Sequence, residues 1–443
     1  MTVQIFAASG LRGAAVLAAA LDSGLLGDAG RRILLLCDTS AVPEASVPLR
    51  QAPGFERLTA RFDEVLSWND AVHPLHPAAW TPRPDDVPLW ERHLRRAWDL
   101  GDEEVELVLE SPDAAPALAV AQVLPGGPVT VYADGLTAYG PTGGKIPPLI
   151  GTRVRQLLHP DLLPGVTPVL LGEFGAVPRP VPAPALLKVL GELAQDAPES
   201  GAPEGAALLL FSGPGTLPAA EEAELHLRMV RGTAALGHTH LVLHADPGGP
   251  APASPALRAE AARLGVELTV PDPRAPLLAE VLCERLRPAL VVGTCSPAMM
   301  SAAVHHGLPV ARAGTGTLLE HLTPYEHPAR IPVTVVDALL PDLAEPAAVA
   351  ERPALTEASV AEALDGLLPA VAFAMQPRVR PDLRPAAERY LSTRLNTRTW
   401  RYFKRRRLGS LALPGVVPAR LAFVGRNAAL RRLARRARAL KRG

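Results

Sequence analysis

Apolar residues along the first half of the chain fall into two alternating patterns. Short β-branched or leucine-rich runs predict four strands, at residues 3–7, 32–37, 105–110 and 129–133. Longer segments with apolar residues at helical spacing predict three helices between them, at residues 13–22, 89–98 and 115–123. This alternation is typical of parallel sheets that are covered by helices on both faces.

The second half of the chain starts the same alternation again. Five strands are predicted, at residues 206–211, 240–244, 267–270, 289–292 and 309–312. Four helices are predicted, at residues 218–235, 255–264, 277–287 and 298–306. The prolines that alternate from Val177 to Pro184 can neither continue a helix nor join a central strand, so this stretch is predicted to be a semi-rigid linker.

These patterns predict an α/β protein with two doubly wound domains that face each other across a cleft. The expected domains are residues 1–180 and 186–375, followed by a helical tail over residues 376–443. The length of 443 residues is sufficient for such domains. Apolar residues make up 48% of the chain and aromatic residues 4%, so the core must consist of Leu, Val and Ala.

The cysteine content and the start of the chain bear on its compartment. Three cysteines are too few for a disulfide framework, which favours a reducing cytosol. The first residues lack the basic region of a secretory signal, and no stretch is a clean membrane span. We therefore expect a cytoplasmic protein.

The net charge of zero conceals a strong asymmetry. Residues 378–443 hold 20 Lys and Arg against 2 Asp and Glu, which leaves 25 basic and 43 acidic residues in the preceding part. In residues 386–408 the arginines are interleaved with apolar residues, and residues 421–440 form a second such segment. This pattern favours an amphipathic helix on an anionic membrane, which would place the protein peripherally on the inner face of the cell membrane. The alternatives are a groove for an acidic glycan, nucleic-acid binding as a third interpretation, and a tail docked on the acidic body.

Polar residues follow the predicted strands where ligands of open α/β sheets bind. Asp134-Gly135 ends the strand at 129–133, so Asp134 is a candidate general base, although Asp-Gly is also a common turn. His244 and Asp246 lie two residues apart at another strand end, which would put both side chains on one face. This spacing suits a coupled pair or a His acid that is oriented by Asp, and a surface turn is the alternative.

Glycine and hydroxyl residues beyond three other strands suggest a phosphate site. In Gly293-Thr-Cys-Ser-Pro, Ser296 occupies an N-cap position, where the helix amino end favours an anion, although a plain capped helix uses the same residues. Gly314-Thr-Gly-Thr317 follows the same logic, and Glu320 is a candidate for binding ribose hydroxyls. Ser212-Gly213 begins a further glycine loop.

The order and spacing of these motifs resemble bacterial sialyltransferases, in an actinobacterial polysialyltransferase-like branch. Tyr132-Ala-Asp-Gly resembles the acid-acid-Gly motif, His244-Ala-Asp-Pro falls at the His-Pro motif, and Gly293-Thr-Cys-Ser-Pro falls at the serine motif. The resemblance implies a GT-B-like fold with two Rossmann-like domains. It also implies CMP-sialic acid as donor, a glycan acceptor, and no cofactor or metal requirement. Asp134 would deprotonate the acceptor, and the motif His would assist departure of the CMP phosphate.

The chain departs from this family pattern at three positions. Ala133 replaces the first acid, Asp246 stands where the motif His belongs, and Pro297 replaces the second serine-motif hydroxyl. An ionised Asp246 would repel the leaving phosphate, and His244 is the nearest substitute. The alternatives are therefore a catalytically impaired nucleotide- or glycan-binding homologue, or a transferase for another nucleotide sugar.

Overall fold

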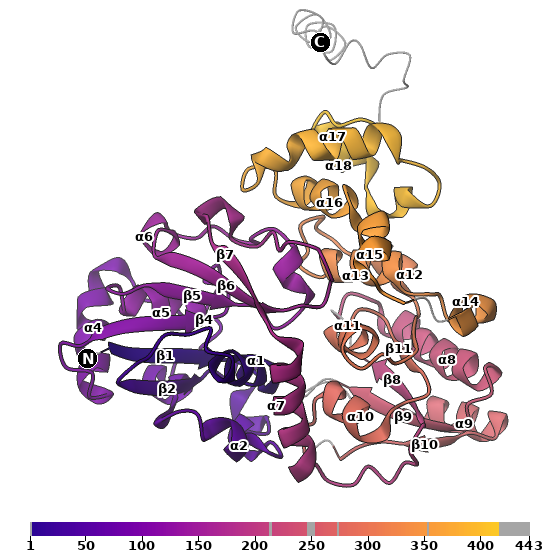
Figure 1. Cartoon of the computed structure of the whole chain (residues 1–443), viewed down its shortest axis with the longest axis horizontal. Helices are drawn as coiled ribbons and strands as arrows, with labels where there is room; N and C mark the ends of the chain where they lie inside the picture. The colour runs from indigo at the N-terminus through magenta and orange to yellow at the C-terminus, as the bar shows by residue number, and fades with distance from the viewer. Residues whose placement is uncertain (1, 212–214, 246–252, 273, 352–353, 416–443) are drawn as a thin grey trace, which may run out of the picture.

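The chain forms two all-parallel sheets, each built from one half of the sequence (Figure 1). The computed structural model describes residues 2–211, 215–245, 253–272, 274–351 and 354–415. The first sheet has the order β3-β2-β1-β4-β5-β6-β7. Its strands are β1 (Thr2–Ala8), β2 (Arg31–Leu36), β3 (Glu64–Ser67), β4 (Glu104–Leu109), β5 (Val129–Tyr132), β6 (Val154–Pro160) and β7 (Val177–Val181). The second sheet has the order β10-β9-β8-β11-β12. Its strands are β8 (Ala207–Phe211), β9 (His240–Ala245), β10 (Glu267–Thr269), β11 (Val291–Gly293) and β12 (Val310–Arg312).

Helices connect the parallel strands and cover both sheets. The first half contains α1 (Leu11–Asp22), α2 (Phe55–Thr59), α3 (Trp68–Val72), α4 (Val87–Ala97), α5 (Ala117–Val123), α6 (Pro148–Gly151) and α7 (Ala183–Asp196). The second contains α8 (Ala219–Ala235), α9 (Pro255–Leu264), α10 (Ala279–Leu286), α11 (Pro297–Val304), α12 (Thr315–His321), α13 (Arg330–Leu339), α14 (Pro346–Glu351), α15 (Glu357–Leu364) and α16 (Leu367–Met375). The tail adds α17 (Arg384–Thr393), the 3-10 turn η7 (Thr399–Tyr402) and α18 (Arg405–Ser410).

Both sheets reverse their strand order beside their first strand, between β1 and β4 and between β8 and β11. Ligands of open α/β sheets bind at such switch points. The predicted fold class, GT-B-like with two Rossmann-like sheets, is confirmed by this topology. The sequence patterns missed β3, β6 and β7 of the first sheet.

The predicted proline linker is wrong, because Val177–Val181 forms strand β7 and pairs with β6 along its length. Pro178 and Pro180 lack an N–H, but an edge strand leaves one side unpaired and tolerates this loss. Helix α7 then begins at Ala183 and packs against α1 of the first half and α10 of the second, between the two sheets in Figure 1. The connection between the halves is therefore a helix packed on both.

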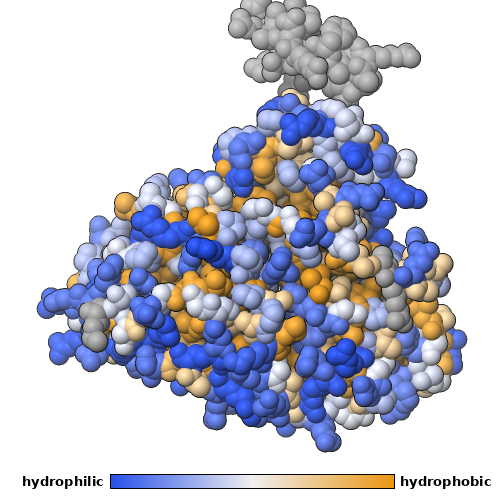
Figure 2. Space-filling model, in the orientation of Figure 1, coloured by the Kyte–Doolittle hydropathy of each residue, from blue (hydrophilic) through white to orange (hydrophobic). Residues whose placement is uncertain are grey.

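The second sheet separates two apolar clusters. In β8, Leu208 and Leu210 belong to the large cluster that extends through the first half, whereas Ala207 and Leu209 belong to a smaller cluster beneath α8 and α9. Successive side chains of a strand point to opposite faces, so the two clusters lie on opposite sides of this sheet. Figure 2 shows hydrophilic residues over most of one face of the molecule, with hydrophobic residues gathered near its middle.

The described part of the tail is docked on the protein. Its apolar side chains Leu391, Phe403 and Leu408 are buried, with 3%, 6% and 0% exposure. Arg380 donates to the carbonyl of Val169 in the first half, and Arg407 pairs with Glu326 in the second half. The prediction that residues 386–408 present an apolar face to a membrane is therefore wrong, because that face packs against the body.

Within the described residues, no single helix is long and apolar enough to span a membrane, and only α15 and α16 together pass that test, as a pair bent by 46°.

Candidate functional site

Asp134 lies two residues beyond the carboxyl end of β5, which is an inner strand of the first sheet. Tyr132, the last residue of β5, donates a hydrogen bond from its hydroxyl to the carbonyl of Ala7 at 2.9 Å, which fixes β5 relative to β1. Burial raises the pKa of Asp134, the positive charge of Arg12 opposes this effect, and the negative charge of Glu280 adds to it. Asp134 is thus a carboxylate that is largely removed from water and has one positive and one negative charge nearby.

A second carboxylate at the same sheet edge, Glu110, was missed by the sequence patterns. It follows β4 directly and accepts hydrogen bonds from the hydroxyl of Ser9 at 2.5 Å and of Tyr132 at 3.2 Å. Burial raises the pKa of Glu110, and the nearby charge of Asp134 raises it further. An acid that ends a strand of the predicted parallel sheet was the available signal, because β4 and β5 end side by side.

A third carboxylate reaches this region from the second half. Glu280, in the first turn of α10, is 2% exposed and forms an ion pair with Arg12, in the first turn of α1. No motif in the sequence connects these two residues, since they lie in different halves. The pair joins the halves beside Asp134.

The Asp134-Gly135 strand end also meets the predicted serine motif. A Cβ atom on Gly135 would lie 2.8 Å from Cγ of Pro297, so the two turns are in direct contact. Ser296 is buried and caps α11, its hydroxyl accepting a hydrogen bond from the amide of Ala298 at 3.3 Å. The structure thus brings Asp134 and Ser296 to the same boundary between the halves, and it gives Ser296 a capping role.

The other residues predicted to bind nucleotide lie on β11 and α12. Gly293 ends β11 and pairs in register with Arg312 at the end of β12. Gly314 adopts φ 73° before α12, a conformation that favours glycine. The carbonyl of Thr317 accepts a hydrogen bond from the ring of His321, and the side chain of Glu320 is exposed. Gly293 is thus at the carboxyl edge of the second sheet, and Thr317 and Glu320 are on the helix that follows β12.

His244 is 7% exposed near the end of β9, and its Nε2 lies 2.9 Å from the carbonyl of Leu277. Its Nδ1 has no hydrogen-bond partner among the residues that the structure describes. Asp246, Ser212 and Gly213 lie outside the described residues, so the expected shared face of His244 and Asp246 stays a prediction.

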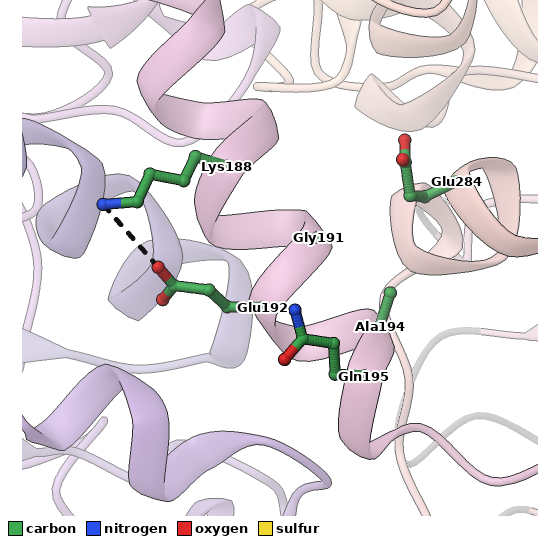
Figure 3. Close-up of a pocket in the computed structure, with 6 residues that line it drawn as sticks. All are labelled: Lys188, Gly191, Glu192, Ala194, Gln195 and Glu284. Atoms are coloured by element: carbon green, nitrogen blue, oxygen red, sulfur yellow. Dashed lines mark ion pairs between the residues drawn. The ribbon is translucent and has the colours of Figure 1, made fainter.

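The space around Asp134 is small. The cavity lined by Arg12, Asp134, Glu280 and Ser301 offers about 10 Å³ to solvent, which is room for roughly one water molecule. A larger open groove of about 600 Å³ lies between α7 and α10. In its lining, Lys188 and Glu192 of α7 form an ion pair (Figure 3). None of the predicted site residues lines that groove. The cavity that Asp134 shares with Arg12 and Glu280 is therefore too small for a sugar.

Comparisons with known proteins leave the substrate open. No family model matches the chain, and no curated protein matches it. Solved structures similar to it include a UDP-GlcNAc 2-epimerase from Neisseria meningitidis bound to UDP-GlcNAc, with 10% identity over 83% of this chain and 99% of that chain (TM-score 0.41). A UDP-glucosyltransferase from Polygonum tinctorium has 13% identity over 93% and 97% (TM-score 0.37). A 2,6-sialyltransferase from Photobacterium sp., solved with CMP and lactose, has 12% identity over 68% and 69% (TM-score 0.37). At this degree of similarity, the ligands of these proteins do not identify the ligand of this chain.

Proposed function

We propose that the protein is a glycosyltransferase that moves an acidic sugar, sialic acid from CMP-sialic acid, to a glycan hydroxyl. The observation that carries this proposal is the contact between Gly135 and Pro297. It joins the strand end that holds Asp134 to the turn that holds Ser296. A base for the acceptor and a site for the donor phosphate are the two parts that such a transfer needs at one boundary.

In the proposed reaction, Asp134 takes the proton of the acceptor hydroxyl while its oxygen attacks the anomeric carbon of the donor. The bond between that carbon and the phosphate oxygen breaks, and CMP leaves with both electrons of that bond. The pKa of Asp134, raised by burial, makes it a stronger base than an exposed aspartate. His244 or Asp246 would supply a proton or hydrogen bond to the leaving phosphate. Ser212, Gly213, Gly293, Ser296, Thr317 and Glu320 would hold the nucleotide.

Asp134→Asn tests the base. It should lower kcat by ~10²-fold or more, the usual scale for a general base. A matched control is Asp161→Asn, because Asp161 directly follows the neighbouring strand β6 and is likewise partly buried. If Asp134→Asn keeps full activity with folding intact, Asp134 is not the base.

The donor is tested by thermal shift. CMP, UDP and GDP are added separately, since a ligand that binds only the folded state raises its melting temperature. A shift with CMP alone supports the proposed donor. A shift with UDP or GDP alone favours transfer from another nucleotide sugar.

A second candidate function is a homologue that binds nucleotide or glycan without catalysis. Two observations favour it: Asp246 replaces the motif His, and the space beside Asp134 holds roughly one water. On this hypothesis, Asp246→His should create or greatly raise transferase activity. If the wild type already transfers sugar and His244→Ala abolishes this, the active enzyme with a relocated acid is the better account.

The basic tail supports a proposed place for the protein, peripheral on an anionic membrane in the cytoplasm. Arg389, Arg394, Arg398 and Arg406 are exposed and form no ion pair among the described residues, so their charge is available to an anionic surface. Residues 421–440, the other part of the prediction, lie outside the described residues. Truncation before Leu421 should weaken binding to phosphatidylserine liposomes, most strongly at low salt. If the full chain ignores such liposomes at low salt, the membrane proposal fails.

A further inference from the structure

Arg12 is positioned between two carboxylates that come from different halves of the chain. It forms an ion pair with Glu280 on α10, and its charge also acts on Asp134 beyond β5. All three side chains line the same small cavity, together with Ser301 of α11. Glu280 is 2% exposed, and its Oε2 has no hydrogen-bond partner among the described residues. A carboxylate buried to this extent needs the arginine beside it.

We propose that Glu280 is a positioning residue that strengthens the base Asp134 when the two halves close, by drawing Arg12 into its own ion pair. The inference rests on the proposed function, because it assigns Asp134 the role of base. Glu280 belongs to the second half, whereas Arg12 and Asp134 belong to the first. The competition for Arg12 therefore exists only while the halves are together.

The direction of the effect follows from the charges. The positive charge of Arg12 lowers the pKa of Asp134, and the negative charge of Glu280 raises it. With the halves apart, Glu280 no longer competes for Arg12, and the carboxylate of Asp134 is a weaker base. With the halves closed, Arg12 is shared with Glu280 and Asp134 holds a proton more strongly. The base thus reaches its full strength only in the closed state, in which water is largely excluded.

The other titratable groups that face this cluster come from several elements. They are Glu110 after β4, Tyr132 on β5, Cys283 and Glu284 on α10, and His305 and His306 after α11. Burial lowers the pKa of both histidines, and it raises those of the tyrosine and the cysteine. These four groups are therefore neutral near pH 7. Glu110 is common to the open and closed states because it belongs to the first half.

The test is the pH dependence of kcat in Glu280→Gln, which keeps the size of the side chain and removes its charge. In this variant no negative charge at position 280 opposes the effect of Arg12 on Asp134, so the pKa of the base falls. The acidic limb of the profile should move to lower pH by about one unit, the scale for an opposite charge at close range. The plateau value of kcat should fall several-fold, because the base is weaker. Arg12→Gln should move the limb in the opposite direction.

Glu284→Gln is the matched control. Glu284 lies one turn further along α10, is 40% exposed, and has a carboxylate oxygen 3.4 Å from Nδ1 of His306. Its removal should leave the limb in place. An ion pair that merely holds the halves together would change KM or the plateau without moving the limb, and that result in Glu280→Gln would overturn the inference.

A measurement independent of activity separates this inference from the proposed function. The change in melting temperature caused by Asp134→Asn is compared at pH 7 in the wild type and in Glu280→Gln. The inference predicts a loss that is larger by at least about 2 °C in the Glu280→Gln background, where Asp134 is the main partner of Arg12. Equal changes in both backgrounds would overturn it. If the protein transfers sugar from none of the donors, the proposed function is wrong. The comparison of melting temperatures would still test the role of Glu280.

Discussion

Asp337 on α13 holds the tail to the second sheet. Asp337→Asn should strongly destabilise the folded protein although it changes only one heavy atom. The side chain of Asp337 is 0% exposed. It accepts hydrogen bonds from Thr315 at 2.6 Å and Tyr402 at 2.8 Å. It also pairs with Arg401 at 3.1 Å and with Arg312 at 3.2 Å. One carboxylate thus joins α13 to β12, α12 and the tail.

The magnitude follows from which partners lose their counter-charge. Removing one member of a buried ion pair costs about 3–5 kcal/mol, because the other member stays buried without compensation. Arg401 is 39% exposed and Arg312 retains Asp342, so the lower end of this range applies. A loss of about 3 kcal/mol corresponds to a fall in melting temperature of roughly 6–12 °C, taking the second half as the cooperative unit.

Differential scanning calorimetry of Asp337→Asn and Asp342→Asn measures this effect with a built-in control. Asp342 pairs with the same Arg312 at 2.7 Å but is 31% exposed. A partly exposed pair of this kind contributes about 1 kcal/mol or less, so Asp342→Asn should lower the melting temperature by at most about 4 °C. Equal losses in the two variants would show that burial does not determine the value of these ion pairs.

Two further predictions concern alkaline pH and the contact between the halves. Burial raises the pKa of all five tyrosines above the ordinary value, so their stabilising contribution is present below pH ~10 and is lost as the pH rises beyond it. Tyrosinate absorbance at 295 nm should therefore rise together with loss of circular dichroism, and a tyrosine that ionises in the folded protein would contradict this. Gly135→Ala places a Cβ 2.8 Å from Pro297 and should cost about 1–3 kcal/mol in thermal denaturation, whereas Gly126→Ala, with no atom within 4 Å of its Cβ, should cost less than that. Equal effects would refute the close contact.

The two-sheet fold was predictable because its central strands are continuous apolar runs. β1, β4 and β5 are buried almost throughout, and so are β8 and β9. The missed strands have other patterns. β3 is half-buried at every position, and β7 carries two prolines that only an edge position tolerates. The prolines correctly excluded a central strand at Val177–Val181. They gave no indication that β6 pairs with this segment on one side.

The site was predictable only where its residues end a recognisable strand. Asp134 and Gly293 met this condition, and the structure places Asp134 just beyond β5 and Gly293 at the end of β11. Arg12 and Glu280 did not, because each lies in the first turn of a helix and becomes part of the site through contact with the other half. The sequence alone gives no indication that two residues 268 positions apart form an ion pair.

On the proposed function, a separation of the two halves would widen the small cavity beside Asp134. Room for roughly one water in this cavity does not admit a sugar ring, whereas an opened form would admit one. Polar contacts between the halves lie near Asp134. They include the Arg12–Glu280 ion pair and the hydrogen bond of His305 to the carbonyl of Asp161 at 3.0 Å. Because substrates that bridge the halves would restore contact around Asp134, their binding can drive the closure that completes the site.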